Sequence, residues 1–91
     1  MSVTVHVPRP LRYECGGAAQ LSLAVTSVSA ALEQLEREFP SLYRSVCDET
    51  GAVRKHVNLF VNDSIVPKWE EPLWALSPGD SLTILPAVSG G

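Results

Sequence analysis

Hydrophobic and polar residues alternate in several short segments of this chain, and a period of two residues is typical of half-buried β-strands. The alternating segments are residues 2–7, 20–25, 56–62 and 81–85. Prolines and turn-forming residues separate them, and a proline cannot donate a backbone hydrogen bond to a sheet. A very short apolar segment at residues 65–66 precedes another proline. We therefore predict four strands and a fifth, very short one at the edge of the sheet.

Between the second and third predicted strands the period changes to that of an α-helix. Apolar residues three and four positions apart form one stripe: Val28, Ala31, Leu32, Leu35 and Phe39. Thr26 or Ser27 can cap the first turn, because a hydroxyl oxygen accepts a bond from an unpaired backbone N–H. Pro40 ends the helix. A short helical turn at residues 42–46 should follow, and residues 45–51 should form a loop.

The order of these elements predicts an α+β fold. A hairpin followed by one helix and further strands indicates one mixed sheet of four to five strands, with one main helix covering one face. The first and last strands can lie parallel in the centre, because the chain between them is long enough to cross over. This is the β-grasp, or ubiquitin-like, arrangement. We expect residues 1–86 to form this domain and residues 87–91 to form a flexible tail.

Composition excludes several classes of protein. The 91 residues allow one domain, and 45% hydrophobic with 19% charged residues is ordinary for a globular chain. The net charge of -3 and the scattered basic residues argue against a nucleic-acid partner. No apolar run is long enough to span a membrane, and the first residues do not resemble a signal peptide. We therefore expect a cytoplasmic protein, in which Cys15 and Cys47 are free thiols and no metal is bound.

The chain ends in Leu85-Pro86-Ala87-Val88-Ser89-Gly90-Gly91. Pro86 should end the last strand, and the two glycines lack the Cβ atoms that would prevent entry into a narrow channel of a partner enzyme. They also leave the terminal carboxylate unhindered. A carboxylate is ionised at neutral pH and is a poor electrophile, so acyl chemistry needs activation by ATP in a partner. The chain has no phosphate-binding loop, so we predict that its carboxylate is a substrate and that the chain is not an enzyme.

Several segments together resemble the MoaD/ThiS family of sulfur-carrier proteins. They are the first predicted strand, the capped helix, Val57 to Asp63, Pro78-Gly79-Asp80 and the ending from Leu85 to Gly91. Within the family, Val57 to Asp63 and the Pro-Ala-Val ending look most similar to the carrier of a thiocarboxylate-dependent cysteine biosynthesis in actinobacteria. The small subunit of molybdopterin synthase more often has two prolines where this chain has Pro86-Ala87.

This resemblance implies a cycle of sulfur transfer through the tail. An E1-like adenylating enzyme would activate Gly91 with ATP, and sulfur would displace AMP to leave a thiocarboxylate. Val88, Ser89, Gly90 and Gly91 would enter the active site of the partner. The sulfur acceptor would be a synthase, for which a PLP-dependent cysteine synthase is one candidate, and a zinc metalloprotease would release the product. ATP, PLP and zinc would belong to these partners, so the chain itself would bind no cofactor.

The sheet face opposite the helix is the expected docking surface. The alternation turns Phe60 and Leu85 outward on this face, where two large apolar side chains would suit a partner interface. Leu85 also matches the position that the family uses against its partners. Alternatively, one or both side chains pack under the loop from residue 69 to residue 74. Cys15 and Cys47 are expected to be structural, because isolated cysteines are reactive only in electropositive surroundings.

Other functions would use the same fold or the same tail. A ubiquitin-like modifier would join Gly91 to a lysine of another protein, and a molybdopterin synthase small subunit would pass its sulfur to a molybdopterin precursor. A plain β-grasp interaction subunit, in which the terminal glycines are incidental, is a further alternative. No acid–base pair or nucleophile–base arrangement in the sequence indicates a stand-alone enzyme.

Overall fold

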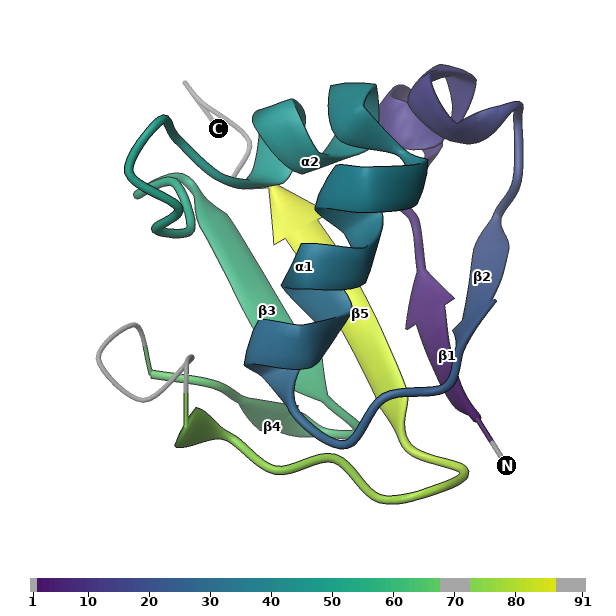
Figure 1. Ribbon diagram of the computed structural model, residues 1–91, viewed down its shortest axis with the longest axis vertical. Helices are drawn as coiled ribbons and strands as arrows, with labels where there is room; N and C mark the ends of the chain where they lie inside the picture. The colour runs from purple at the N-terminus through teal and green to yellow at the C-terminus, as the bar shows by residue number, and fades with distance from the viewer. Residues whose placement is uncertain (1, 68–72, 87–91) are drawn as a thin grey trace.

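The computed structural model describes residues 2–67 and 73–86, which form a five-stranded sheet with helices packed against one face (Figure 1). The strands are β1 (Val3–His6), β2 (Gln20–Leu23), β3 (Val57–Val61), β4 (Ser64–Ile65) and β5 (Ser81–Pro86). Their order across the sheet is β2-β1-β5-β3-β4. β1 and β5 are parallel neighbours, and the other pairs are antiparallel. The prediction of a mixed sheet with its first and last strands side by side near the centre is confirmed.

The main helix, α1 (Val28–Glu38), confirms the predicted cap and the predicted stripe. The side-chain oxygen of Ser27 accepts a hydrogen bond from the backbone N–H of Ala30 at 3.0 Å. The stripe has three completely buried residues, Val28, Ala31 and Leu35. Its other two residues, Leu32 and Phe39, are partly buried against the core. The cap satisfies one of the helix's unpaired N–H groups, and such a cap contributes about 1 kcal/mol.

A second helix, α2 (Pro40–Val46), follows α1 without a loop. The sequence predicted a short helical turn at residues 42–46, and α2 confirms it but begins earlier, at Pro40. The predicted loop from residue 45 was wrong for Ser45 and Val46, which belong to α2. A proline is favourable at the first position of a helix, because its φ angle fits and the N–H it lacks would have no partner there. Pro40 therefore ends α1 and also begins α2. Leu42 and Val46 are completely buried, which holds α2 on the core.

A 3₁₀-helix, η1 (Arg9–Cys15), lies between β1 and β2 and was not predicted. The sequence indicated only the end of a strand at Pro8 and a turn near residues 16–17. That turn is present, with φ angles of 71° and 85° at its two glycines. Arg12 Nε donates a hydrogen bond of 3.0 Å to the carbonyl oxygen of Val7, which ties η1 to the end of β1. A helix this short has no apolar period from which it could be recognised.

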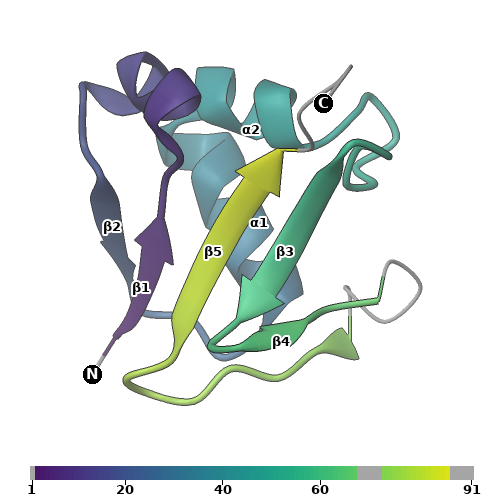
Figure 2. The ribbon, with the colours of Figure 1, turned by 180° about the vertical axis from the view of Figure 1, so that it is seen from behind.

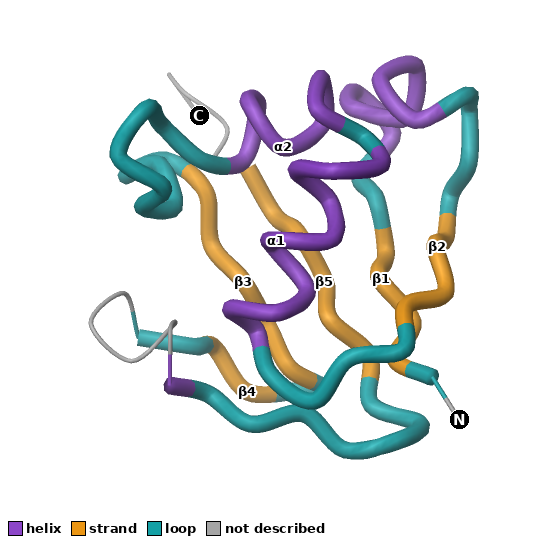
Figure 3. The backbone as a smooth tube through the Cα atoms, viewed as in Figure 1, coloured by secondary structure: helices purple, strands orange, loops and turns teal. Residues whose placement is uncertain are grey.

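The core lies between the sheet and the helices, which Figure 3 shows together on one side of the strands. All inward residues predicted for β1, β3 and β5 are buried: Val3, Val5, Val57, Leu59, Val61, Leu82 and Ile84. Full burial of a valine or leucine side chain contributes about 1.5–3 kcal/mol. The alternation along the strands therefore decides which face of the sheet binds the helices and which face remains open.

The element boundaries differ from the predicted ones by one or two residues. β2 and β3 are shorter than predicted, and β4 begins one residue earlier. β5 continues through Pro86, which pairs with Val57, so the prediction that the chain leaves the sheet at Pro86 was one residue early. A proline lacks only the donor, and its φ angle is compatible with the end of an extended strand.

Some predictions fall on residues that the structure does not describe. Trp69 and the proposed tail, residues 87–91, lie outside the described ranges, so the domain boundary after Pro86 stays a prediction. Trp74 is described and packs partly against the core. Within residues 2–67 and 73–86, no helix is long and apolar enough to cross a membrane.

Candidate functional site

The end of β5 is the root of the predicted reactive tail. β5 lies between β1 and β3 in the middle of the sheet (Figure 2). β1 pairs with Ser81 to Thr83, so the pairing at the end of β5 is with β3. Its last residue, Pro86, lies opposite Val57 at the start of β3. Val88, Ser89, Gly90 and Gly91 lie outside the described residues. The structure therefore shows where β5 ends, and the start of the tail and the predicted roles of its residues stay predictions.

The open face of the sheet carries an apolar patch beside this root, formed by Phe60, Ile65 and Leu85. Phe60 on β3 lies directly opposite Ile65 on β4. Leu85 on β5 lies opposite Asn58 on β3, two residues along from Phe60 and on the same face. Leu85 is 44% exposed and Ile65 is 52% exposed, whereas Phe60 is half-buried. These three side chains form an apolar group on a face whose other strand residues are polar.

Polar residues surround the patch on this face. Thr83 lies between His6 and Phe60 in the register of the three central strands. Thr4 and Ser81 form the next row of the same face. None of these strand residues carries a carboxylate or a Lys or Arg side chain. The face therefore offers a hydrophobic centre with an uncharged polar border, which is the usual composition of a docking surface.

The sequence predicted Phe60 and Leu85 in this surface but missed Ile65. Val61 pairs with Ser64, so only Asn62 and Asp63 form the turn between β3 and β4. Asn62 has a φ of 55°, which suits the left-handed conformation that such two-residue hairpin turns require. Recognising Asn-Asp as a two-residue turn would have placed Ile65 opposite Phe60. Most of the loop from residue 69 lies outside the described residues, so the alternative that it covers one of these side chains stays a prediction.

A polar network at the beginning of β5 holds this region in register. Asn62 Nδ2 donates to Asp80 Oδ1 at 3.1 Å, and Asn62 Oδ1 accepts from the backbone N–H of Ser81 at 3.1 Å. Asp80 Oδ2 accepts from the backbone N–H of Ser77 at 2.8 Å. The bonds from Ser77 and Asn62 lower the pKa of the Asp80 carboxyl below its usual value. The network joins the β3–β4 turn to β5 and so helps to fix where the patch lies.

Both cysteines are buried as thiols outside any disulfide, as predicted. Cys15 Sγ lies 3.5 Å from the carbonyl oxygens of Arg12 and Ala18. Their burial is consistent with the structural role expected for them. In the described ranges, no group of three or more His, Cys, Asp or Glu side chains could hold a metal ion.

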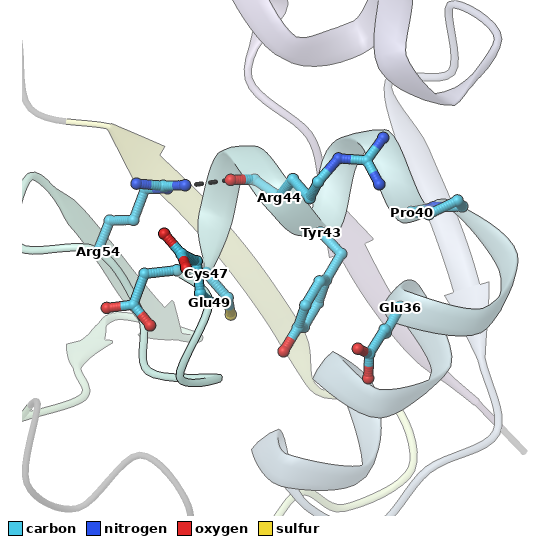
Figure 4. A pocket seen from close by; sticks show the side chains of 8 residues that line it. Glu36, Pro40, Tyr43, Arg44, Cys47, Glu49 and Arg54 are labelled. Carbon is cyan, nitrogen blue, oxygen red and sulfur yellow. Dashed lines mark hydrogen bonds between the residues drawn. The ribbon is translucent and has the colours of Figure 1, made fainter.

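Cys47 contributes to a hollow of about 360 Å³ between the helices and the loop that follows them (Figure 4). Its lining residues are Glu36, Pro40, Tyr43, Arg44, Cys47, Asp48, Glu49 and Arg54. Burial raises the pKa of the Tyr43 phenol, and the neighbouring Cys47 and Glu36 add to this shift. Arg54 Nε donates to the carbonyl oxygen of Arg44 at 3.0 Å, which joins the loop to α2. Carboxylates and guanidinium groups mix in this hollow, so it does not select ligands of one charge.

The β-grasp sheet, its open face and the strand that leads into a Gly-Gly ending define a ubiquitin-like protein of the carrier or modifier class. The model of the ThiS family matches residues 5–91. The chain therefore belongs to the ThiS family. Sulfur carrier protein CysO of Mycobacterium tuberculosis (strain ATCC 25618 / H37Rv) is 36% identical over 93 residues, which cover 100% of both chains.

Solved structures give the same result. The crystal structure of Mycobacterium tuberculosis CysO superposes with a TM-score of 0.84 at 34% identity, covering 94% of this chain and 99% of the other. A chain of the Amycolatopsis orientalis BexX/CysO complex gives 0.83 at 31% identity, covering 98% and 99%. SAMP1 of Haloferax volcanii gives 0.81 at 26% identity, with 100% of both chains covered. These matches confirm the predicted family, the β-grasp fold and the predicted class of sulfur carrier.

Proposed function

We propose that this chain carries sulfur as a thiocarboxylate at Gly91 and that an E1-like enzyme forms this group with ATP. The observation that carries the proposal is a ThiS-family β-grasp whose central strand, β5, leads directly into a tail ending in Gly90-Gly91. In the first step the Gly91 carboxylate attacks the α-phosphate of ATP, and pyrophosphate leaves. In the second step a hydrosulfide-level sulfur donor attacks the carbonyl carbon, and AMP leaves with the electrons of the C–O bond.

The length of the tail matches this role. Residues 87–91 follow the end of β5 and, when extended at about 3.3–3.6 Å per residue, reach roughly 17 Å beyond Pro86. The carboxyl group can then enter a deep, narrow site of the partner while the folded domain stays outside. The glycines add no Cβ atoms at the narrowest point. Pairing of Leu85 and Pro86 with β3 holds the root of the tail, which limits the conformational freedom lost on docking.

The apolar patch is the proposed docking surface for the enzymes that act on the tail. Phe60, Ile65 and Leu85 lie on the open face, and Leu85 is the second residue before the tail begins. A partner that covers the patch therefore also lies beside the root of the tail. The E1-like enzyme and the sulfur-accepting synthase would use the same patch in turn, since both must receive the same tail.

For the sulfur acceptor we propose an activated serine derivative on a PLP-dependent cysteine synthase. The thiocarboxylate sulfur would displace the leaving group of the activated serine, and an acyl shift from sulfur to nitrogen would leave cysteine bound to Gly91 by an amide. A zinc metalloprotease would then hydrolyse this amide. The full-length similarity to CysO proteins supports this acceptor. PLP, zinc and ATP stay with these partners, and the carrier acts in the cytoplasm as a cosubstrate without catalytic groups of its own.

An intact-mass measurement tests the proposal. The chain is incubated with a candidate E1-like enzyme, ATP and sulfide, beside a control chain that lacks Gly91. We expect a mass gain equal to the replacement of one oxygen by one sulfur, which the control does not show. If several such enzymes leave the mass unchanged, the thiocarboxylate proposal is refuted and the plain interaction subunit becomes the better explanation.

A second candidate is a ubiquitin-like modifier. The structure of a small archaeal modifier protein, SAMP1, supports it, with a TM-score of 0.81 and 26% identity. The same incubation with a lysate distinguishes the two functions. A modifier gives Gly91-dependent conjugates of higher mass that survive reducing agents, whereas the sulfur carrier loses sulfur to a small-molecule acceptor. Cysteine formed from an activated serine would also exclude the molybdopterin synthase subunit.

A further inference from the structure

The outer edge of β2 offers a row of backbone hydrogen-bonding groups. β2 is the first strand in the sheet order and has only β1 as a neighbour. Figures 1 and 2 both show β2 at the side of the sheet, with no drawn helix or strand along its outer edge. Within residues 2–67 and 73–86, the backbone groups of Gln20, Ser22 and Ala24 form no hydrogen bond on that outer side. This edge is therefore open to another strand.

Two bonds on β1 show which groups of β2 point outward. The backbone N–H of Val7 donates to the carbonyl of Ala19, so the residue pairs Val7–Ala19, Val5–Leu21 and Val3–Leu23 are hydrogen-bonded pairs. The N–H of Thr4, between them, donates instead to Asp80 on the other side of β1. Thr4 and Ser22 therefore form a non-hydrogen-bonded pair, and in such a pair the backbone groups of both residues point away from the partner strand. Ser22, opposite Thr4, therefore directs its N–H and carbonyl to the outer edge, and so do Gln20 and Ala24.

The edge also lacks the usual features that prevent strand pairing. Natural edge strands are protected by lysines, prolines, bulges or very short length. The segment from Cys15 to Leu32, which contains β2 and the first turn of α1, has no Asp, Glu, Lys, Arg, His or Pro residue. The opposite edge of the sheet differs, because β4 has only Ser64 and Ile65 and follows Asp63. Charge is depleted at the core of interfaces, so this neutral segment suits a buried contact.

We propose that β2 pairs with β2 of a second copy of this chain, antiparallel and about a two-fold axis at Ser22. In this register Ser22 lies opposite Ser22 of the second copy, and Gln20 lies opposite Ala24. All three outward residues then exchange both of their backbone bonds, which gives about six hydrogen bonds across the edge. Any other register leaves some of these groups without a partner. An uncharged strand can pair with its own copy without repulsion, and a two-fold axis closes the assembly at two chains.

The same register also matches the side chains. Leu21 and Leu23 lie on the helix side of the sheet, opposite Val5 and Val3. Leu23 is buried, whereas Leu21 at the edge is only partly buried. In the dimer, Leu21 of one protomer lies beside Leu23 of its partner, so the core layer continues across the axis. On the other face, small and polar side chains meet: Ser22 with Ser22, and Gln20 with Ala24.

This dimer is compatible with sulfur transfer but does not rest on it. The two-fold axis is perpendicular to the sheet, so both apolar patches stay on the open face of one continuous sheet. The two β5 strands point in opposite directions, and the two tails therefore leave from opposite ends. A short strand–strand contact is at the low end of interface sizes, below about 1,200 Å², so the dimer should form reversibly and depend on protein concentration.

Sedimentation velocity over a wide concentration range tests the proposal. It compares the wild-type chain with two variants that carry opposite charges at position 22. We expect the wild-type chain to shift from monomer to dimer as its concentration rises. Ser22→Lys and Ser22→Glu each place like charges directly across the axis, which should raise the dimer dissociation constant by up to about fivefold. An equal mixture of these two variants should dimerise again, because unlike charges then meet. A wild-type chain that is monomeric at every concentration would overturn the proposal.

Two further variants test whether the dimer contact lies at the edge of β2 or elsewhere on the chain. Ser22→Pro removes an N–H that points outward and leaves the ladder to β1 intact, so it should abolish the dimer while circular dichroism stays native. Ser64→Lys changes the other edge of the sheet and should leave the dimer unchanged. If the dimer persists in folded Ser22→Pro, or if Ser64→Lys removes it, the contact is elsewhere and the proposed register is wrong.

Discussion

Replacing Leu85 by alanine tests whether the apolar patch is a docking surface. Leu85 is 44% exposed, and burial of a whole leucine side chain contributes about 1.5–3 kcal/mol. A partner that covers the exposed part gains 44% of this, or about 0.7–1.3 kcal/mol. A factor of ten in affinity corresponds to about 1.4 kcal/mol, so we expect docking to weaken about three- to ninefold. Alanine keeps the Cβ atom, so these values are upper bounds.

The assay is the initial rate of thiocarboxylate formation, followed by intact mass at several carrier concentrations. We expect a higher KM with an unchanged kcat, because the patch contributes to binding and does not touch the reacting carboxyl. Asn58→Ala is the matched control, since Asn58 lies directly opposite Leu85 on the same face but is polar. Urea unfolding of both variants confirms that they are folded. An unchanged KM in a folded Leu85→Ala variant would refute the docking role of this side chain.

Three further perturbations test the tail, the helix cap and the polar network. Gly90→Val adds a branched side chain to the tail that is proposed to enter the partner, so thiocarboxylate formation should fall at least about a hundredfold while the free energy of unfolding stays unchanged. Ser27→Ala removes the cap bond to Ala30 and should lower the free energy of unfolding by about 1 kcal/mol, measured in urea, with Ser41→Ala, an exposed residue inside α2, as the control. The pKa of the Asp80 carboxyl is lower in the folded state than in the unfolded state. The ionised carboxyl therefore stabilises the fold at a pH above its pKa in the unfolded state, and this stabilisation is lost as the pH falls through its pKa in the folded state. The urea midpoints of the wild type and of Asp80→Asn should therefore differ at neutral pH and become similar at acidic pH. A difference that stays constant with pH would contradict this linkage.

Local sequence patterns predicted most of the fold because the strands bury only one face. Alternation assigned the inward residues of β1, β3 and β5 correctly, since a slip of one residue would place a whole strand's apolar side chains in solvent. The cap at Ser27 and the apolar stripe of α1 could also be predicted from the local sequence. The 3₁₀-helix η1 was missed, because its seven residues have no period and its place depends on contacts with the end of β1 and with α2.

The sequence predicted only part of the candidate site, for a related reason. Phe60 and Leu85 could be predicted from their own strands, since each alternates with buried neighbours. Ile65 could not, because its strand has only two residues, too few to show a period. Its position beside Phe60 follows from the two-residue turn at Asn62-Asp63, which sets the register of the hairpin.

The sequence by itself determined the class of this protein: a β-grasp domain of the ThiS family, whose matched region includes Gly90-Gly91. These properties are local, because they depend on periods of two and 3.6 residues and on the residues at one terminus. The tertiary structure alone decided which side chains share a surface and which backbone groups lack a partner. Both depend on strand order and register, and these are set by contacts between segments far apart in the chain. The apolar patch of Phe60, Ile65 and Leu85 and the open edge of β2 are therefore visible only in the folded sheet.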